Sequence, residues 1–145
     1  MKRRNFAMLI LLAGLALPLT GWAAEGGISR DDETAITEVV QSQLKAVAGN
    51  DADAAFALAT ADTRSRMGDS YKFLQLIKQQ YAPIYRHQRA IFSAPEVIDG
   101  ETVQIVRLTD SDNSVWLALY QMQQEADGNW KIAGCTLVET RTVSV

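Results

Sequence analysis

Residues 114–124, SVWLALYQMQQ, decide the fold class of this chain. Within this run VWLALY, residues 115–120, is apolar at both alternating sets of positions, so both faces of its strand should be covered. Turn sequences flank it: ADGN at 126–129 is a hairpin signal, and DSDNS at 110–114 makes a looser connection. We therefore predict a central strand with helices on one face and a second subunit as the candidate cover of the other.

Three further extended segments surround this strand: RAIFSAPEVI at 89–98, TVQIVRLT at 102–109 and NWKIAGCTLVET at 129–140. Asp99 and Gly100 form a strong two-residue hairpin signal between the first two. Pro95 cannot donate a hydrogen bond to a neighbouring strand, which places its segment at an edge or a bulge. Consecutive hairpins predict a four-stranded antiparallel sheet.

The chain before residue 83 has helical periodicity instead. A first helix is expected from Asp31 to Gly49, and a short second helix, capped by Asp51 or Asp53, should bury Phe56 and Leu58. A third should begin near Asp69 or Ser70 and end at Ala82, because Pro83 disfavours helical geometry before it; its shared face comprises Phe73, Leu74, Ile77 and Tyr81. Helices followed by a meander predict a single α+β domain over residues 31–145.

The first residues, MKRRNFAMLILLAGLALPLTGWAA, predict a signal peptide over 1–23. Charge, an apolar run and small residues follow in that order, with cleavage expected after Ala23, or alternatively after Ala24. The run is interrupted by Pro18 and Thr20, which argues against a retained membrane anchor. We expect a flexible tail over 24–30, a periplasmic or secreted product, and no stable membrane insertion after cleavage.

The charge of the expected mature chain argues against one class of partner. Removal of the leader's three basic residues leaves 11 Lys and Arg against 17 Asp and Glu, a net charge of −6. Nucleic-acid binding depends on cations that displace phosphate counterions, so we expect no nucleic-acid partner.

Several stretches resemble one family: AAFALATADTRSRMGD, YAPIYR, WLALYQMQ and DGNWKIAGCTLV. They are similar to an exported bacterial family known as domain of unknown function 4864. Helices followed by a four-stranded meander also resemble the nuclear transport factor 2-like superfamily, which includes ketosteroid isomerase and scytalone dehydratase. The resemblance implies a cone formed by N-terminal helices on a curved sheet. It implies no activity, because this superfamily includes catalysts, binders and dimerisation modules.

The single cysteine, Cys135, lies in the middle of an expected strand. A reactive thiol needs a helix start, a cation or a histidine nearby, and the nearest cation on its expected face, Lys131, is four residues away, or roughly 13 Å. A small packed apolar residue is the favoured interpretation, with an intermolecular disulfide or a redox role as alternatives.

The basic segment YRHQR, 85–89, offers two other kinds of site. His87 with Cys135 is too small a set for zinc, so no metal and no cofactor is expected. Arg86 and Arg89, with Lys78 one or two helical turns earlier, could hold an anionic ligand, although such residues are usually a solvated edge.

Two functional hypotheses remain. An isomerase, dehydratase or hydrolase needs a carboxylate and a proton donor in one cavity, for which Asp69 or Asp62 with Tyr81 or Tyr120 are weak catalytic candidates. The favoured hypothesis is a non-catalytic domain that binds a small apolar or anionic ligand, or a protein, through a cone pocket or a sheet face, as a homodimer. Its pocket candidates are Phe73, Tyr81, Tyr85, Arg86, Trp116, Tyr120 and Trp130.

Overall fold

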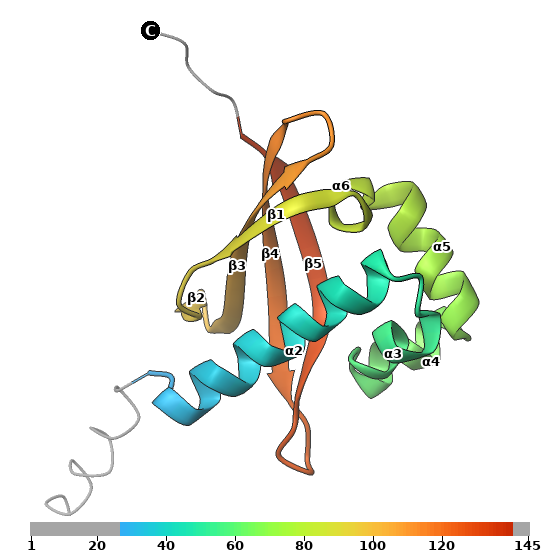
Figure 1. Cartoon of the computed structure of the whole chain (residues 1–145). Coiled ribbons are helices and arrows are strands. Elements are labelled where there is room, and N and C mark those ends of the chain that lie inside the picture. Colours follow the sequence, from blue (N-terminus) through green and yellow to red (C-terminus); the bar gives the residue numbers. More distant parts are fainter. Residues whose placement is uncertain (1–26, 141–145) are drawn as a thin grey trace, which may run out of the picture.

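A computed structural model describes residues 27–140. Helices come first and strands afterwards, as the sequence predicts (Figure 1). The helices are α2 (Arg30–Ala48), α3 (Ala52–Ala57), α4 (Ala61–Met67), α5 (Ser70–Gln80) and α6 (Ala82–Tyr85). The strands are β1 (His87–Phe92), β2 (Glu96–Ile98), β3 (Glu101–Asp110), β4 (Val115–Gln124) and β5 (Trp130–Glu139). The α+β class, with helices packed on a curved antiparallel sheet, is confirmed.

The sheet has five strands rather than the predicted four. Its order is β1-β3-β4-β5, and β2 also pairs with β3. The expected segment 89–98 divides into β1 and β2 because Pro95 interrupts it, and both pieces pair with β3 at the edge of the sheet. β4 lies between β3 and β5, so the central position predicted for residues 114–124 is confirmed.

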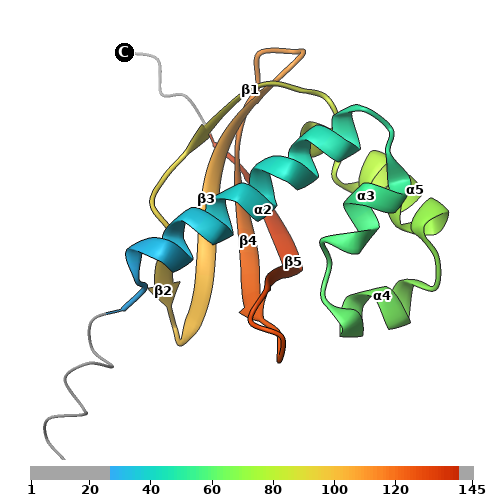
Figure 2. The same cartoon turned by 60° about the horizontal axis from the view of Figure 1, so that its bottom comes forward.

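The longest helix, α2, lies across one face of the sheet (Figures 1 and 2). Ser29 caps its start by accepting a hydrogen bond from the Asp32 amide at 3.1 Å. The core forms between this helix and the strands, from buried residues that include Ile36, Val40, Val47, Val106, Leu108 and Ala118. α3, α4 and α5 gather at one side of the molecule, next to β5 (Figure 2).

Two short helices and one helix end differ from the sequence prediction. α4 and α6 were not expected, and α5 ends at Gln80, with Tyr81 as its C-cap, rather than at Ala82. Pro83 lies in the first turn of α6. Backbone N–H groups there have no intrahelical acceptor, so the missing N–H of proline costs the helix no hydrogen bond. In α3 the buried residue is Ala55, whereas Phe56 and Leu58 are only half-buried.

A β-bulge in β5 shapes the wall of the cavity described below. Gln121 pairs with Gly134 and Met122 with Ile132, so Ala133 is the extra residue. Because the bulge shifts the alternation of side chains by one residue, Ile132 rather than Lys131 shares the buried face with Cys135. The Ala133 carbonyl accepts a hydrogen bond from the Thr63 hydroxyl at 3.1 Å, which ties α4 to the sheet.

The predicted signal peptide, 1–23, and most of the predicted tail lie outside the described residues. Within residues 27–140, no helix is long and apolar enough to cross a membrane.

Candidate ligand cavity

A cavity of about 190 Å³ lies between the helices and the β5 side of the sheet. Its walls come from α4, α5, β4 and β5, with contributions from α2 and α6. Most lining side chains are apolar, including Phe73, Leu76, Ile77, Ile84 and Ile132. The arrangement is typical of a small-molecule site, which combines apolar walls with a few polar groups.

Tyr120 is a fully buried residue in the cavity wall. It lies on the helix-facing side of β4, between Gln104 of β3 and Cys135 of β5. Its hydroxyl has no hydrogen-bond partner among the described residues. Burial raises the pKa of Tyr120 well above its ordinary value, with a smaller contribution from Cys135, so the hydroxyl is neutral and keeps its proton.

Cys135 lines the same cavity, opposite Tyr120 on the neighbouring strand. Burial raises the pKa of its thiol from an ordinary 9.0 to about 12. The thiolate is the nucleophilic form, so this thiol is a poor nucleophile at neutral pH. The two strands therefore present two neutral, protonated groups side by side.

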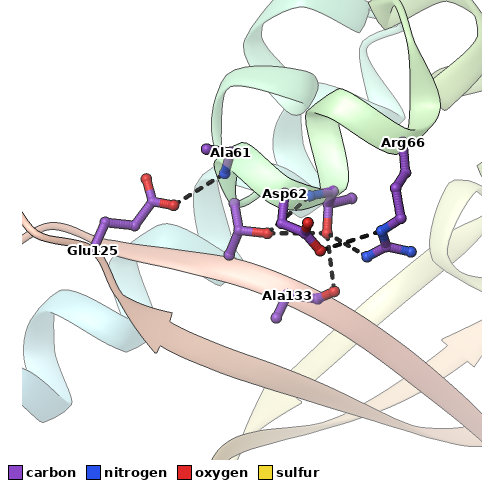
Figure 3. A network of polar contacts seen from close by, with 7 residues as sticks. Ala61, Asp62, Arg66, Glu125 and Ala133 are labelled. Atoms are coloured by element: carbon purple, nitrogen blue, oxygen red, sulfur yellow. Dashed lines mark hydrogen bonds and ion pairs between the residues drawn. The ribbon is translucent and has the colours of Figure 1, made fainter.

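Polar contacts help to hold α4 beside the cavity (Figure 3), together with the packing of half-buried Met67 against the core. None of its residues is buried. The Glu125 carboxylate accepts a hydrogen bond from the Ala61 amide at 3.0 Å, and Arg66 forms an ion pair with Asp62 at 3.2 Å. Among residues 27–140, Arg66 is the one charged residue in the cavity lining, and it stays largely exposed.

The two candidate carboxylates do not line the cavity. Asp69 caps α5, where its Oδ1 accepts a hydrogen bond from the Lys72 amide at 2.8 Å, and its side chain is exposed. Asp62 is exposed and paired with Arg66. No Asp or Glu within residues 27–140 lines the cavity, so the isomerase-type hypothesis has no carboxylate base there.

The cavity brings together some of the predicted pocket residues and leaves others elsewhere. Phe73, Tyr81 and Tyr120 line it. The others lie outside it. The Lys78 ammonium lies 5.0 Å from the ring centroid of Tyr85, and Arg86 is exposed. The indole N–H of Trp116 donates a hydrogen bond to Asp110 at 3.1 Å, and that of Trp130 donates one to Asp32 at 3.0 Å. Those indoles therefore anchor surface carboxylates to the core.

Histidine geometry offers no metal centre in the described part of the chain. Nδ1 of His87 lies 2.8 Å from the Ile84 carbonyl, in hydrogen-bond contact. No group of three or more potential ligand side chains comes together within residues 27–140.

Sequence reasoning missed the contribution of α4, which supplies Thr63, Arg66 and Met67 to the lining. This helix has no apolar stripe: none of its residues is fully buried, and Met67 alone among them packs, half-buried, against the core. Two residues in the sequence mark the ends of this helix. Thr60 caps its start by accepting a hydrogen bond from the Thr63 amide at 3.2 Å, and Gly68, with a φ of +93°, follows its last residue.

Comparison with known proteins gives one match. A family model described as "Domain of unknown function (DUF4864)" matches residues 29–145. No curated protein matches the chain, and no solved structure matches it.

Proposed function

We propose that this chain, which belongs to the DUF4864 family of domains of unknown function, is a non-catalytic protein that binds a small molecule. The ligand occupies the cavity that contains Tyr120 and Cys135. We extend the proposal to an exported, periplasmic or secreted location, which rests on the leader-like sequence of residues 1–23. Placement in the nuclear transport factor 2-like superfamily is likewise a proposal, supported by helices on a curved antiparallel sheet.

The unpartnered hydroxyl of Tyr120 carries this proposal. A buried hydroxyl without a hydrogen bond costs about 1–3 kcal/mol of folding free energy, so such groups are rare. Phenylalanine at the same position would avoid that cost and keep the packing. A ligand that completes the hydrogen bond supplies a physical reason for a tyrosine in this wall.

The described cavity favours binding over catalysis. Tyr120 and Cys135 both keep their protons at neutral pH, and no carboxylate lines the walls within residues 27–140. Proton transfer to or from a substrate needs a group with a pKa near the working pH. The site can hold a molecule but offers no acid–base pair.

The test is ligand-observed NMR on the purified protein with a library of one-ring compounds. Leu76, a half-buried residue in the cavity wall, is replaced in Leu76→Trp to reduce the volume. The control is Tyr71→Trp, on the same helix but 69% exposed. We expect saturation transfer to a subset of compounds, lost in Leu76→Trp and retained in the control. The cavity proposal is wrong if no compound binds, or if binding is equal in both variants.

A second proposal concerns the outer face of the sheet, opposite the helices. Ile91 and Val138 are 50% and 47% exposed there. They flank Arg107 and Leu117 in one continuous cross-strand row, from Ile91 of β1 to Val138 of β5. An apolar face of this kind is typical of a protein interface. We propose that a second copy of the chain covers it, in agreement with the two-sided apolar strand 115–120.

A further inference from the structure

We propose that the ligand of the cavity is an uncharged molecule of one-ring size whose carbonyl oxygen, or an equivalent acceptor, is held by the Tyr120 hydroxyl. This inference rests on the proposed function and specifies its ligand class. It is based on the unused hydrogen bond of the Tyr120 hydroxyl, the charges of the residues that line the cavity, and the cavity volume.

The neighbours of Tyr120 do not use its hydrogen-bonding capacity. Gln104, paired with it on β3, gives its amide N–H₂ to the Ser93 and Ile105 carbonyls, and its Oε1 accepts from Thr37 at 3.0 Å. Cys135, on β5, makes no hydrogen bond with it among the described contacts. The hydroxyl therefore needs an acceptor from outside the described chain.

A carbonyl oxygen suits this hydroxyl better than a second hydroxyl does. A phenol donates a hydrogen bond readily but accepts weakly, because its lone pair is delocalised into the ring. A ligand hydroxyl would also bring its own hydrogen, which needs a further acceptor in the wall. A carbonyl satisfies Tyr120 without adding an unpaired donor.

The walls disfavour a charged ligand. Within the described residues, Arg66 is the only charged group that lines the cavity, and it is exposed and paired with Asp62. The basic residues considered for an anion site, Lys78 and Arg86, do not line it. An ionised carboxylate next to Tyr120 would lose its hydration without gaining a cation, which is strongly unfavourable.

The volume limits the size of the ligand. An apolar cavity of about 150 Å³ is large enough to bind benzene. The present cavity, at about 190 Å³, therefore accommodates a six-membered ring with one small substituent.

Three one-ring probes separate these requirements: cyclohexanone and methylenecyclohexane, which have nearly equal shapes, and the charged cyclohexanecarboxylate. Their dissociation constants are measured for the unmodified protein, for Tyr120→Phe and for Tyr71→Phe as the exposed tyrosine control. We expect Tyr120→Phe to weaken the binding of cyclohexanone about fivefold and to leave the binding of methylenecyclohexane unchanged, because only the ketone accepts a hydrogen bond from the hydroxyl. Retained hydrocarbon binding also shows that the variant is folded. The infrared carbonyl stretch of bound ketone should shift to lower frequency only when Tyr120 is present.

The outcomes separate the ligand class from the cavity itself. If the affinity for cyclohexanone is the same in Tyr120→Phe as in the unmodified protein, the ketone does not use the hydroxyl; the ligand class is then wrong and the binding cavity stands. Tightest binding of the carboxylate also overturns the ligand class. If none of the probes binds and Leu76→Trp changes nothing in the compound screen, both proposals fail.

Discussion

Tyr120 and Cys135 show how two neighbouring strands create an unusual pair of residues. Both side chains contribute to the core side of the sheet, and burial raises the pKa of each. The thiol is consequently protonated at neutral pH, which agrees with its interpretation as a packed residue. Whether it also forms an intermolecular disulfide is decided by a non-reducing gel.

The raised pKa of Cys135 predicts a specific loss of stability at high pH. The unfolded thiol releases its proton near pH 9, whereas the folded one holds it until about 12. Above pH 9 the unfolded state therefore binds fewer protons, and the free energy of unfolding falls as the pH rises. Between pH 9 and 12 we expect a steeper fall for the unmodified protein than for Cys135→Ala, measured by urea unfolding. Parallel curves would show that the folded thiol titrates normally.

Thiol labelling gives an independent measurement of the same residue. We expect a thiol reagent at pH 8 to react slowly with the native protein and rapidly with the protein in urea, because burial keeps the native thiol protonated. Rapid native labelling would contradict a packed role and make Cys135 a candidate reactive residue.

At the scale of elements, the two helices next to the cavity are stabilised in different ways. α4 has no buried residue, whereas α5 carries buried Phe73, Leu74 and Ile77. α5 is stabilised by its apolar face as well as by its cap. α4 is held by its hydrogen bonds to Ala133 and Glu125.

Asp69 should behave as a helix cap. Asp69→Ala removes the acceptor for the Lys72 amide, and we expect the free energy of unfolding to fall by about 1 kcal/mol. Asp112→Ala, at an exposed turn carboxylate, is the control and should change it by less than about 0.5 kcal/mol. Binding of one-ring compounds should be the same in both variants, since Asp69 does not line the cavity. Loss of binding without loss of stability would restore Asp69 as a site residue.

The contact between α4 and the bulge predicts local rather than global opening. Thr63→Val keeps the shape of the side chain and removes its hydrogen bond to the Ala133 carbonyl. A bond worth about 1 kcal/mol corresponds to roughly fivefold faster amide exchange in α4. Ser65→Ala, on the exposed side of the same helix, should leave exchange unchanged. An equal effect in all helices would mean that α4 opens only with the whole domain.

At the scale of the whole molecule, both faces of the sheet carry apolar side chains, although exposed Arg107 interrupts those of the outer face. One face packs against α2 and forms the core, while the other exposes Ile91 and Val138. The proposed second copy would remove these side chains from water, which stabilises association by roughly 25 cal/mol for each Å² buried.

Dimerisation is tested by placing a charge on the outer face. We expect the unmodified protein to sediment as a dimer and Val138→Lys as a monomer, because the lysine cannot be buried without a partner. Tyr71→Lys changes a more exposed large side chain on the helical side and should stay dimeric. A monomeric unmodified protein contradicts the proposal. If Tyr71→Lys dissociates instead, the interface lies on the helices.

The order and class of the elements could be predicted because they follow from local pattern. The periodicity of α2 and α5, the hairpin signal at Asp99 and Gly100, and the apolar run 115–120 all act within a few residues. α4 escaped prediction because its contacts, such as Thr63 with Ala133, join residues that are far apart in the chain. Pro95 predicted an edge or a bulge for segment 89–98, but it did not predict that the segment divides into two strands.

The sequence by itself determined the α+β class, the helix caps at Asp51 and Asp69 and the central place of residues 114–124, because hydrophobic periodicity and turn chemistry are local properties. Only the tertiary structure decided which aromatic residues line the cavity. Tyr120, Trp116 and Trp130 are similar in sequence context, yet the two indoles find carboxylates at the surface and the Tyr120 hydroxyl finds none. That difference depends on strand register and on the packing of helices over the sheet: the β3–β4 hairpin brings Trp116 to Asp110, and the packing of α2 brings Asp32 to Trp130 from 98 residues away.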